Sequence, residues 1–219
     1  MVLDSKKTNQ RMVKAALELI YRDGFDGLKL RQVAAKAGVN LGLFHYHFGS
    51  KDDFVRAVLQ ETYDRFFHRF RLESKGSGPA WERLRGTAIA FGCFMRDNRL
   101  LMLALLRDSF QGHRPVLEFV EANLPRHIEV FRALLQKSMK EGSVEETPLP
   151  LALSFLLGAV NMANLAVGLM EHAGVKSLRG KPMEQFEKEN LSDEAIALRV
   201  DMALRGLGLK KAVRPEKRK

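Results

Sequence analysis

The chain has 219 residues, enough to bury a sizeable core. Its single cysteine, Cys93, excludes an internal disulfide and a multi-cysteine zinc site. A formal net charge of +10 at pH 7 points to a polyanionic partner.

The positive charge is concentrated at the two ends of the chain. Residues 1–51 carry nine Lys and Arg against four Asp and Glu, and residues 210–219 carry six against Glu216 alone. The intervening residues 52–209 hold 21 basic and 21 acidic side chains. We therefore expect the N-terminal region to meet a polyanion such as DNA. We expect residues 210–219 to be a disordered, solubilising tail, with a supplementary DNA contact as the alternative.

Helical spacing of apolar residues dominates the chain, and no alternating pattern indicates a sheet, so we predict an all-α fold. Apolar positions repeat at steps of three and four from Thr8, and Gly24 ends this first helix. Ser50 supplies an N-cap, with Asp53 three residues later, for a long helix that links a head to a body. The first four helices are predicted at residues 8–23, 30–37, 41–47 and 51–72.

A segment rich in Gly, Ser and Pro, residues 74–79, predicts a linker before the body. The helices of the body are predicted at residues 81–95, 100–110, 116–140 and 149–170, and Ser192 caps a final one. The chain is thus expected to form three segments: a DNA-binding domain (1–50), a ligand-binding and dimerisation domain (51–209) and the tail (210–219).

Residues 149–170 are apolar nearly all round and long enough to cross a membrane. Asn161 and Asn164 lie in the middle of this segment, however, and the acids Glu146 and Glu171 flank it where a membrane span favours Lys or Arg. We therefore expect a soluble helix that is covered on two sides. Because the N-terminus also has no secretory-signal layout, we expect a cytoplasmic protein without a membrane partner.

Residues 30–44 have the pattern of a helix-turn-helix. Ala34 is small where two helices cross closely, and Gly38 can adopt the left-handed conformation that the turn needs. Asn40 carries an acceptor suited to capping the following helix, whose first residues could reach into a major groove. Two ordinary core helices would explain the apolar spacing but not this combination.

The run from Leu30 through Gly38 and on to Phe54 resembles the signature of the TetR family of bacterial regulators, and the resemblance extends from Met12 to Leu59. It implies a three-helix DNA-binding head and a helical body that dimerises and holds an inducer. It also implies that the helix at 41–47 enters the major groove and that Lys51 contacts a phosphate. Carried over by position, the DNA-binding residues would be Arg31, Gln32, Asn40, Leu41, Gly42, Leu43, His45, Tyr46, His47 and Lys51.

The chain departs from that family pattern in three places. Leu28 and Lys29 stand where the family has Thr or Ser, so the usual cap of the second helix is missing. His45 stands where tyrosine is usual, and Tyr46 could replace its phosphate contact in part. Leu41 and Leu43 are apolar, which shifts recognition toward thymine methyl groups and DNA shape.

Catalysis and metal binding have little support in the sequence. It contains no phosphate-binding glycine loop, nucleophile elbow or pair of catalytic carboxylates, so we expect a non-enzyme without a cofactor. His45 and His47 are two residues apart on a helix and face different sides, which argues against a metal site. Cys93 lies among apolar residues, which favours a buried structural thiol over a redox sensor.

The resemblance implies that a small apolar or aromatic effector binds in the body. Asn161 and Asn164 would orient it, because buried amides need partners. Ordinary core packing is the alternative for each residue of this set. The predicted ligand-binding residues are Phe91, Phe94, Met95, Met102, Leu106, Phe155, Asn161, Met162, Asn164 and Leu165.

Small residues along 149–170 and the apolar stripe of the final helix suggest a four-helix interface between two copies of the chain. The predicted dimer residues are Ala152, Ala159, Ala163, Ala166, Ile196, Val200, Ala203, Leu204 and Leu207. With this interface, the resemblance implies a homodimeric repressor that binds palindromic double-stranded DNA and that a ligand releases by changing the separation of its two heads. The alternatives are a constitutive DNA-binding protein whose body only dimerises, and an enzyme that uses its helix-turn-helix for protein contacts.

Overall fold

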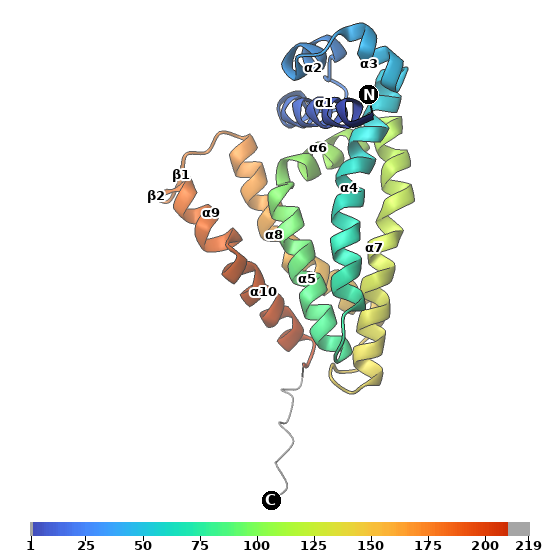
Figure 1. Ribbon diagram of the computed structural model, residues 1–219. Coiled ribbons are helices and arrows are strands. Elements are labelled where there is room, and N and C mark those ends of the chain that lie inside the picture. Colours follow the sequence, from blue (N-terminus) through green and yellow to red (C-terminus); the bar gives the residue numbers. More distant parts are fainter. Residues whose placement is uncertain (1, 210–219) are drawn as a thin grey trace, which may run out of the picture. The chain divides into compact units, whose positions relative to one another are not determined.

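The computed structural model describes the backbone of residues 2–209 and the side chains of residues 8–209 other than Leu43 and His45 (Figure 1). The predicted basic tail, residues 210–219, lies outside the described residues. The chain divides into two compact units. Unit 1 comprises residues 1–66 and 98–124, and unit 2 comprises residues 67–97 and 125–219.

The described residues form ten helices and one two-stranded ribbon, so the predicted all-α fold class is confirmed. The elements are α1 (Val2–Asp23), α2 (Leu30–Ala37), α3 (Leu41–Phe48), α4 (Lys51–Lys75), α5 (Ala80–Asp97), α6 (Arg99–Phe110), α7 (Arg114–Lys140), α8 (Leu149–His172), β1 (Ser177–Leu178), β2 (Lys181–Pro182), α9 (Met183–Leu191) and α10 (Asp193–Gly206).

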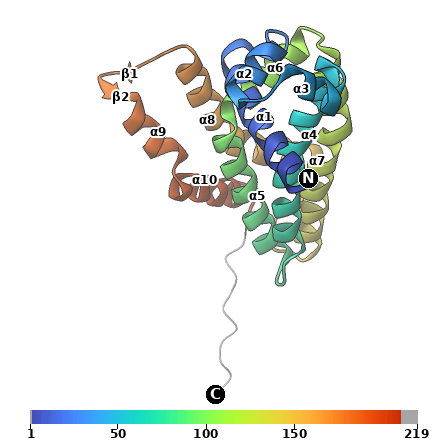
Figure 2. The ribbon, with the colours of Figure 1, turned by 45° about the horizontal axis from the view of Figure 1, so that its top comes forward.

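Unit 1 is built around α1, which packs against both α2 and α6, while α2 contacts α3 (Figures 1 and 2). Its core contains the fully buried side chains of Ile20, Phe25 and Val33. Phe44 of α3 meets Phe54 of α4 edge-on, with ring centroids 4.6 Å apart. Burial of these apolar side chains, rather than the short helices' own propensity, therefore holds α2 and α3 in place.

Unit 2 has an aromatic core in which Phe70, Phe91 and Phe131 pack together, with ring centroids 5.4 to 6.2 Å apart. Helix α8 packs against α5 and α10. At Gly92 of α5 a Cβ atom would lie 2.8 Å from Ile196 Cγ2, so a side chain at residue 92 would push the helices apart.

The ribbon and α9 were not predicted. Ser177 pairs with Pro182 and Leu178 with Lys181, which leaves a two-residue turn at Arg179 and Gly180. Both turn residues have positive φ, 50° and 80°, as a tight hairpin turn requires. Strands of two residues are too short to give an alternating pattern, which is why the sequence did not reveal them.

Helix α8 is the one described helix that is long and apolar enough to cross a membrane by length and composition. In unit 2 it is instead packed against α5 and α10, and Asn164 in its middle is fully buried. The remaining surface of α8 carries exposed apolar side chains.

Candidate nucleic-acid interface

The turn between α2 and α3 has the geometry that its sequence predicts. Gly38 adopts a left-handed conformation with φ 63° and ψ 43°, and the N–H of Val39 donates to the Ala34 carbonyl at 3.0 Å. Arg11 of α1 reaches the same turn, donating from Nε to the carbonyl of Ala37 at 2.9 Å and from Nη2 to that of Gly38 at 2.8 Å. The two helices are therefore fixed relative to each other and to α1.

Asn40 caps α3 as predicted. Its Oδ1 accepts a hydrogen bond from the backbone N–H of Gly42 at 2.7 Å, which satisfies one of the amides that a helix start leaves unpaired. At the start of α2, by contrast, Lys29 makes no side-chain capping bond, as the missing Thr or Ser implied.

Helix α3 divides its residues between the core and the surface. Phe44 is fully buried, Leu41 and His47 are half-buried, and Tyr46 is 84% exposed. The Tyr46 and His47 rings meet edge-on with centroids 5.5 Å apart. Gly42 is also exposed. The predicted contacts at Leu43 and His45 lie outside the described side chains.

The predicted backbone-contacting residues of α2, Arg31 and Gln32, are both exposed. Lys51, the predicted phosphate anchor, is half-buried, and its ammonium group donates to the backbone carbonyl of Asp26 at 2.5 Å. The lysine that opens α4 therefore holds the loop between α1 and α2, a contact that was not predicted from the sequence.

The start of α4 is capped as predicted. The N–H of Asp53 donates to Ser50 Oγ at 3.1 Å, and Ser50 Oγ donates to the Asp53 carboxylate at 2.5 Å. This hydroxyl hydrogen bond, with help from nearby Arg56, holds the pKa of Asp53 below its usual value. The carboxylate therefore stays charged near the helix N-terminus, where negative charge is favourable.

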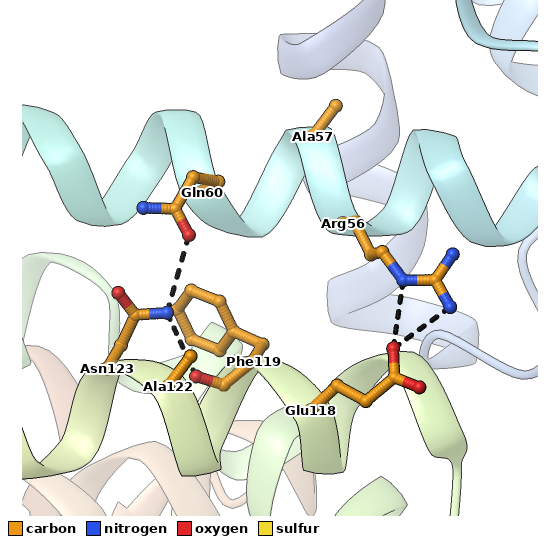
Figure 3. A pocket seen from close by; sticks show the side chains of 7 residues that line it. All are labelled: Arg56, Ala57, Gln60, Glu118, Phe119, Ala122 and Asn123. Carbon is orange, nitrogen blue, oxygen red and sulfur yellow. Dashed lines mark hydrogen bonds and ion pairs between the residues drawn. The ribbon is translucent and has the colours of Figure 1, made fainter.

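A groove of about 390 Å³ lies between α4 and α7 within unit 1 (Figure 3). Arg56 and Glu118 form an ion pair with N–O distances of 3.0 Å at one end, and the Asn123 amide donates to Gln60 Oε1 at 3.3 Å at the other. The remaining lining residues are Ala57, Phe119 and Ala122. This groove contains none of the residues predicted to bind a ligand.

Those predicted ligand residues are divided between the two units. Met102 and Leu106 lie on α6 in unit 1, half-buried and exposed respectively. Phe91 and Asn164 are buried in unit 2, where Nδ2 of Asn164 donates to the Gly92 carbonyl at 3.3 Å. The other members in unit 2 are half-buried (Phe94, Met95, Asn161 and Leu165) or exposed (Phe155 and Met162).

Asn161 and Asn164 have a further property in common. The Oδ1 atom of each is buried and has no hydrogen-bond partner among the described residues. A buried acceptor without a donor carries a desolvation cost of about 1 to 3 kcal/mol. Such atoms are suited to receive a donor from a bound molecule.

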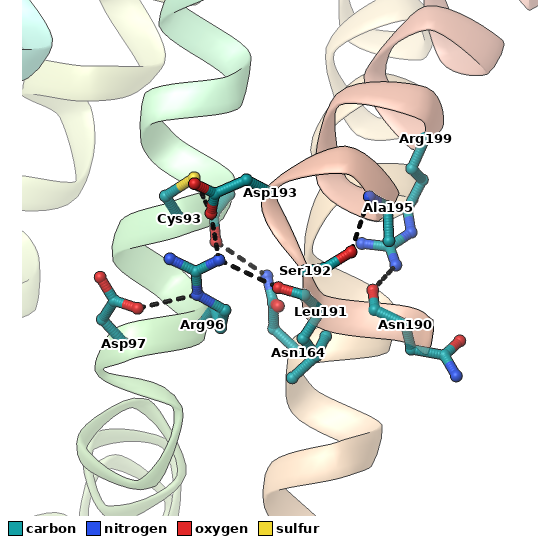
Figure 4. Close-up of polar contacts among 11 residues, drawn as sticks. Cys93, Arg96, Asp97, Asn164, Asn190, Leu191, Ser192, Asp193, Ala195 and Arg199 are labelled. Atoms are coloured by element: carbon teal, nitrogen blue, oxygen red, sulfur yellow. Dashed lines mark hydrogen bonds and ion pairs between the residues drawn. The ribbon is translucent and has the colours of Figure 1, made fainter. Parts of the chain in front are cut away.

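A polar cluster joins the end of α5 to the corner between α9 and α10 in unit 2 (Figure 4). Arg96 binds the Asp193 carboxylate at 2.5 Å, Asp97 at 2.8 Å and the Leu191 carbonyl at 3.0 Å. The Arg96 hydrogen bond keeps the pKa of Asp193 low.

Cys93 on α5, beside Asp193, is half-buried, and burial raises the pKa of its thiol, which disfavours the reactive thiolate. Among the described residues, no group of three or more His, Cys, Asp and Glu is arranged to hold a metal ion.

The predicted dimer residues of α10 lie inside unit 2 rather than on its surface. The buried members are Ile196, Val200, Ala203, Leu204 and Leu207. They face the core because α10 packs its apolar stripe against α5 and α8 of the same chain. On α8, Ala152 is also buried, Ala159 and Ala163 are half-buried, and Ala166 is exposed.

The surface of these two helices carries large apolar side chains that were not predicted to form an interface. On α8 and α10 the exposed members are Leu151, Phe155, Met162, Leu169, Leu198 and Met202. Those on α8 are separated by four, seven and seven residues, which places them on one face of the helix. We call these six residues the α8/α10 face.

Comparison with known proteins is most specific in the head. Residues 12–58 match the family model described as "Bacterial regulatory proteins, tetR family". The chain is 41% identical over 56 residues to the HTH-type transcriptional regulator TtgW of Pseudomonas putida, a match that covers 26% of this chain and 42% of that protein. It is 32% identical over 140 residues to the repressor NicS of Pseudomonas putida, covering 62% of this chain and 65% of NicS. The chain thus matches less than two thirds of the length of either relative.

Solved structures share the fold over nearly the whole chain. The regulator FadR from Bacillus subtilis, solved in complex with stearoyl-CoA, superposes with a TM-score of 0.69 at 15% identity, covering 90% of this chain and 98% of FadR. The ketosteroid regulator KstR2 of Mycobacterium tuberculosis also gives a TM-score of 0.69, at 16% identity, covering 93% and 95%. The head thus carries the sequence signature of the tetR family of bacterial regulatory proteins, and the chain as a whole shares its fold with these solved regulators.

Proposed function

We propose that the chain is a cytoplasmic, homodimeric transcriptional repressor that binds a palindromic DNA operator and is released from it by a small apolar ligand. The observation that carries this proposal is the capped helix α3, which exposes Tyr46, together with the exposed Arg31 and Gln32 of the preceding helix α2. A short helix held in this way is suited to the major groove.

Within this proposal the residues have different roles on DNA. Arg31 and Gln32 contact the phosphate backbone, and Lys51 adds a charged contact at the start of α4. Asn40, Leu41, Gly42, Leu43, His45, Tyr46 and His47 form the surface that meets the bases. Because few of these side chains can make paired hydrogen bonds to a base, apolar contact and DNA shape contribute much of the specificity.

The α8/α10 face supports dimerisation. Exposed apolar side chains that line up on neighbouring helices are a common mark of a protein interface. Gly206 of α10 lies against Phe155 of α8, where a Cβ would be 3.0 Å from the ring, so the two helices touch at an exposed member of this face. Two copies related by a two-fold axis would bury this face in a four-helix arrangement.

The ligand part of the proposal is supported by the buried Oδ1 atoms of Asn161 and Asn164 in unit 2, neither of which has a hydrogen-bond partner among the described residues. FadR from Bacillus subtilis, which shares the fold, was solved with stearoyl-CoA. We therefore expect the ligand to be an apolar molecule that has a hydrogen-bond donor or is joined to a carrier such as coenzyme A. A constitutive DNA-binding dimer remains the alternative function.

Selection from a random DNA pool, followed by affinity measurements on the selected site and on a version with one half scrambled, tests the DNA-binding and dimer parts. We expect tight binding to a palindrome by two chains and a steep loss of affinity with salt. A panel of fatty acids, acyl-CoA thioesters, steroids and aromatic compounds then tests release. A chain that selects no palindrome would contradict the repressor, and selection without release by any compound would favour the constitutive protein.

A further inference from the structure

The loop between α1 and α2 is tied to the C-terminal end of α6 by a buried carboxylate. Asp108, 1% exposed, accepts a hydrogen bond at its Oδ2 from the backbone N–H of Phe25 at 2.6 Å. Its Oδ1 accepts from Arg107 Nε at 2.9 Å. All three residues belong to unit 1.

The surroundings make this contact specific. Phe25 is fully buried, and its ring lies 6.3 Å from that of His113, which follows α6. The Arg107 guanidinium fills the space beside Gly24, where a Cβ atom would collide with it. A buried carboxylate is tolerated only when its oxygens are well paired, so the loop and α6 must keep this arrangement for Asp108 to stay satisfied.

The same loop is also held by a second helix, because Lys51 at the start of α4 donates to the carbonyl of Asp26. Phe25 is therefore bound by α6, and the adjacent Asp26 is bound by α4. This loop sets the direction in which the chain leaves α1 and enters α2, and α2 carries α3. A change in the position of α6 would therefore reach the DNA-binding helices through Asp108.

We propose that Asp108 is a positioning residue for DNA recognition. Asp108 does not touch DNA. It holds the loop of residues 24–28 against α6, so that α2 and α3 of each head keep a fixed angle to α6. This inference rests on the proposed function, because a fixed angle matters most when two heads of a dimer must reach two half-sites of a palindrome together.

The test compares Asp108→Ala with wild type on two DNAs: the selected palindrome and the same DNA with one half-site scrambled. Losing the acceptor for a buried amide should weaken binding to the palindrome by about tenfold or more. Binding to the single half-site should stay at the wild-type level, because the contacting residues are unchanged. Hydrogen exchange at the Phe25 amide should become faster.

A control variant separates positioning from folding. Asp108→Asn keeps an acceptor for the Phe25 amide and should retain most of the wild-type affinity for the palindrome. Equal loss on both DNAs would overturn the proposal, since it would mean that the head itself is damaged, and so would unchanged affinity for the palindrome. Equal affinity of the wild-type chain for both DNAs would instead refute the palindrome-binding dimer, and the role of Asp108 with it.

Discussion

The ammonium group of Lys51 donates a hydrogen bond to the backbone carbonyl of Asp26, 25 residues earlier in the chain. On DNA, the same group would meet a phosphate. We predict that Lys51→Ala weakens binding to all DNA sequences about equally and lowers the slope of log affinity against log salt by about one per head. A titration at several salt concentrations measures this slope. Unchanged salt dependence would leave Lys51 with its structural contact only.

Tyr46 is the most exposed large side chain described on α3. We predict that Tyr46→Ala changes base preference at one position of each half-site, because a wrong base pair at a position that the protein reads costs about 1 to 3 kcal/mol of binding free energy. Tyr46→Phe is the matched control, since it removes the hydroxyl alone. Repeating the selection with each variant reads out the preference. An identical selected sequence with Tyr46→Ala would exclude a base-reading role.

Asn40 combines a cap with a position on the proposed DNA surface. We predict that Asn40→Ala lowers the free energy of unfolding by about 0.5 to 2 kcal/mol, because the N–H of Gly42 loses its acceptor. Asn40→Asp keeps an acceptor and should retain most of the stability, while its negative charge should weaken DNA binding. Chemical denaturation and DNA titration of both variants separate the two roles. Loss of stability with Asn40→Asp would contradict the capping role.

The α8/α10 face predicts the outcome of a charge introduced on it. Met162 is 64% exposed, and Met162→Glu should dissociate the proposed dimer, because a carboxylate would have to be buried without a partner. Leu72→Glu is the matched control, since Leu72 is 62% exposed on α4 and is not a member of this face. Sedimentation velocity of both variants checks the effect. A dimer that persists with Met162→Glu would place the interface elsewhere.

Within unit 2, Arg85 of α5 binds both carboxylate oxygens of Asp201 on α10, at 2.5 and 2.9 Å. The Arg85 hydrogen bond lowers the pKa of Asp201. The ion pair therefore stabilises the folded protein at pH values above the carboxyl pKa of the unfolded chain, about 3.9. This stabilisation is lost as the pH falls through the lower pKa that Asp201 has in the folded protein. We predict that Asp201→Asn destabilises the protein at pH 7 and that the difference in stability between the variant and wild type shrinks as the pH falls below about 4. A difference independent of pH in urea unfolding would show that the ion pair contributes nothing.

Local sequence patterns predicted most of the head. The bounds of α2, the left-handed Gly38 and the caps at Asn40 and Ser50 follow from residues that are close in sequence. What the sequence did not reveal depends on contacts between distant segments. Lys51 with Asp26 and Arg11 with Ala37 join a side chain to a backbone carbonyl, and any residue can supply a carbonyl.

In the body too, the sequence did not reveal which distant segments would pack together. Periodicity identified the apolar stripe of α10 but could not say whether the chain itself or a second copy covers it, and the structure shows that α5 and α8 do so. Asp108 did leave a trace in the sequence. It continues the buried spacing of Leu101, Ala104 and Leu105 on α6, so an acid stands at a core position. A charged residue in a buried stripe of this kind is a useful sign of a specific contact.

The exposed apolar surface of α8 and α10 has a consequence for how the chain would respond to its own abundance. If DNA binding requires two copies joined through this surface, the amount of competent protein rises with the square of the chain concentration while monomers predominate. Occupancy of the operator would then change more steeply with expression level than a single-chain binder allows. Such a repressor would go from low to high operator occupancy over a narrow range of its own concentration, even without a ligand.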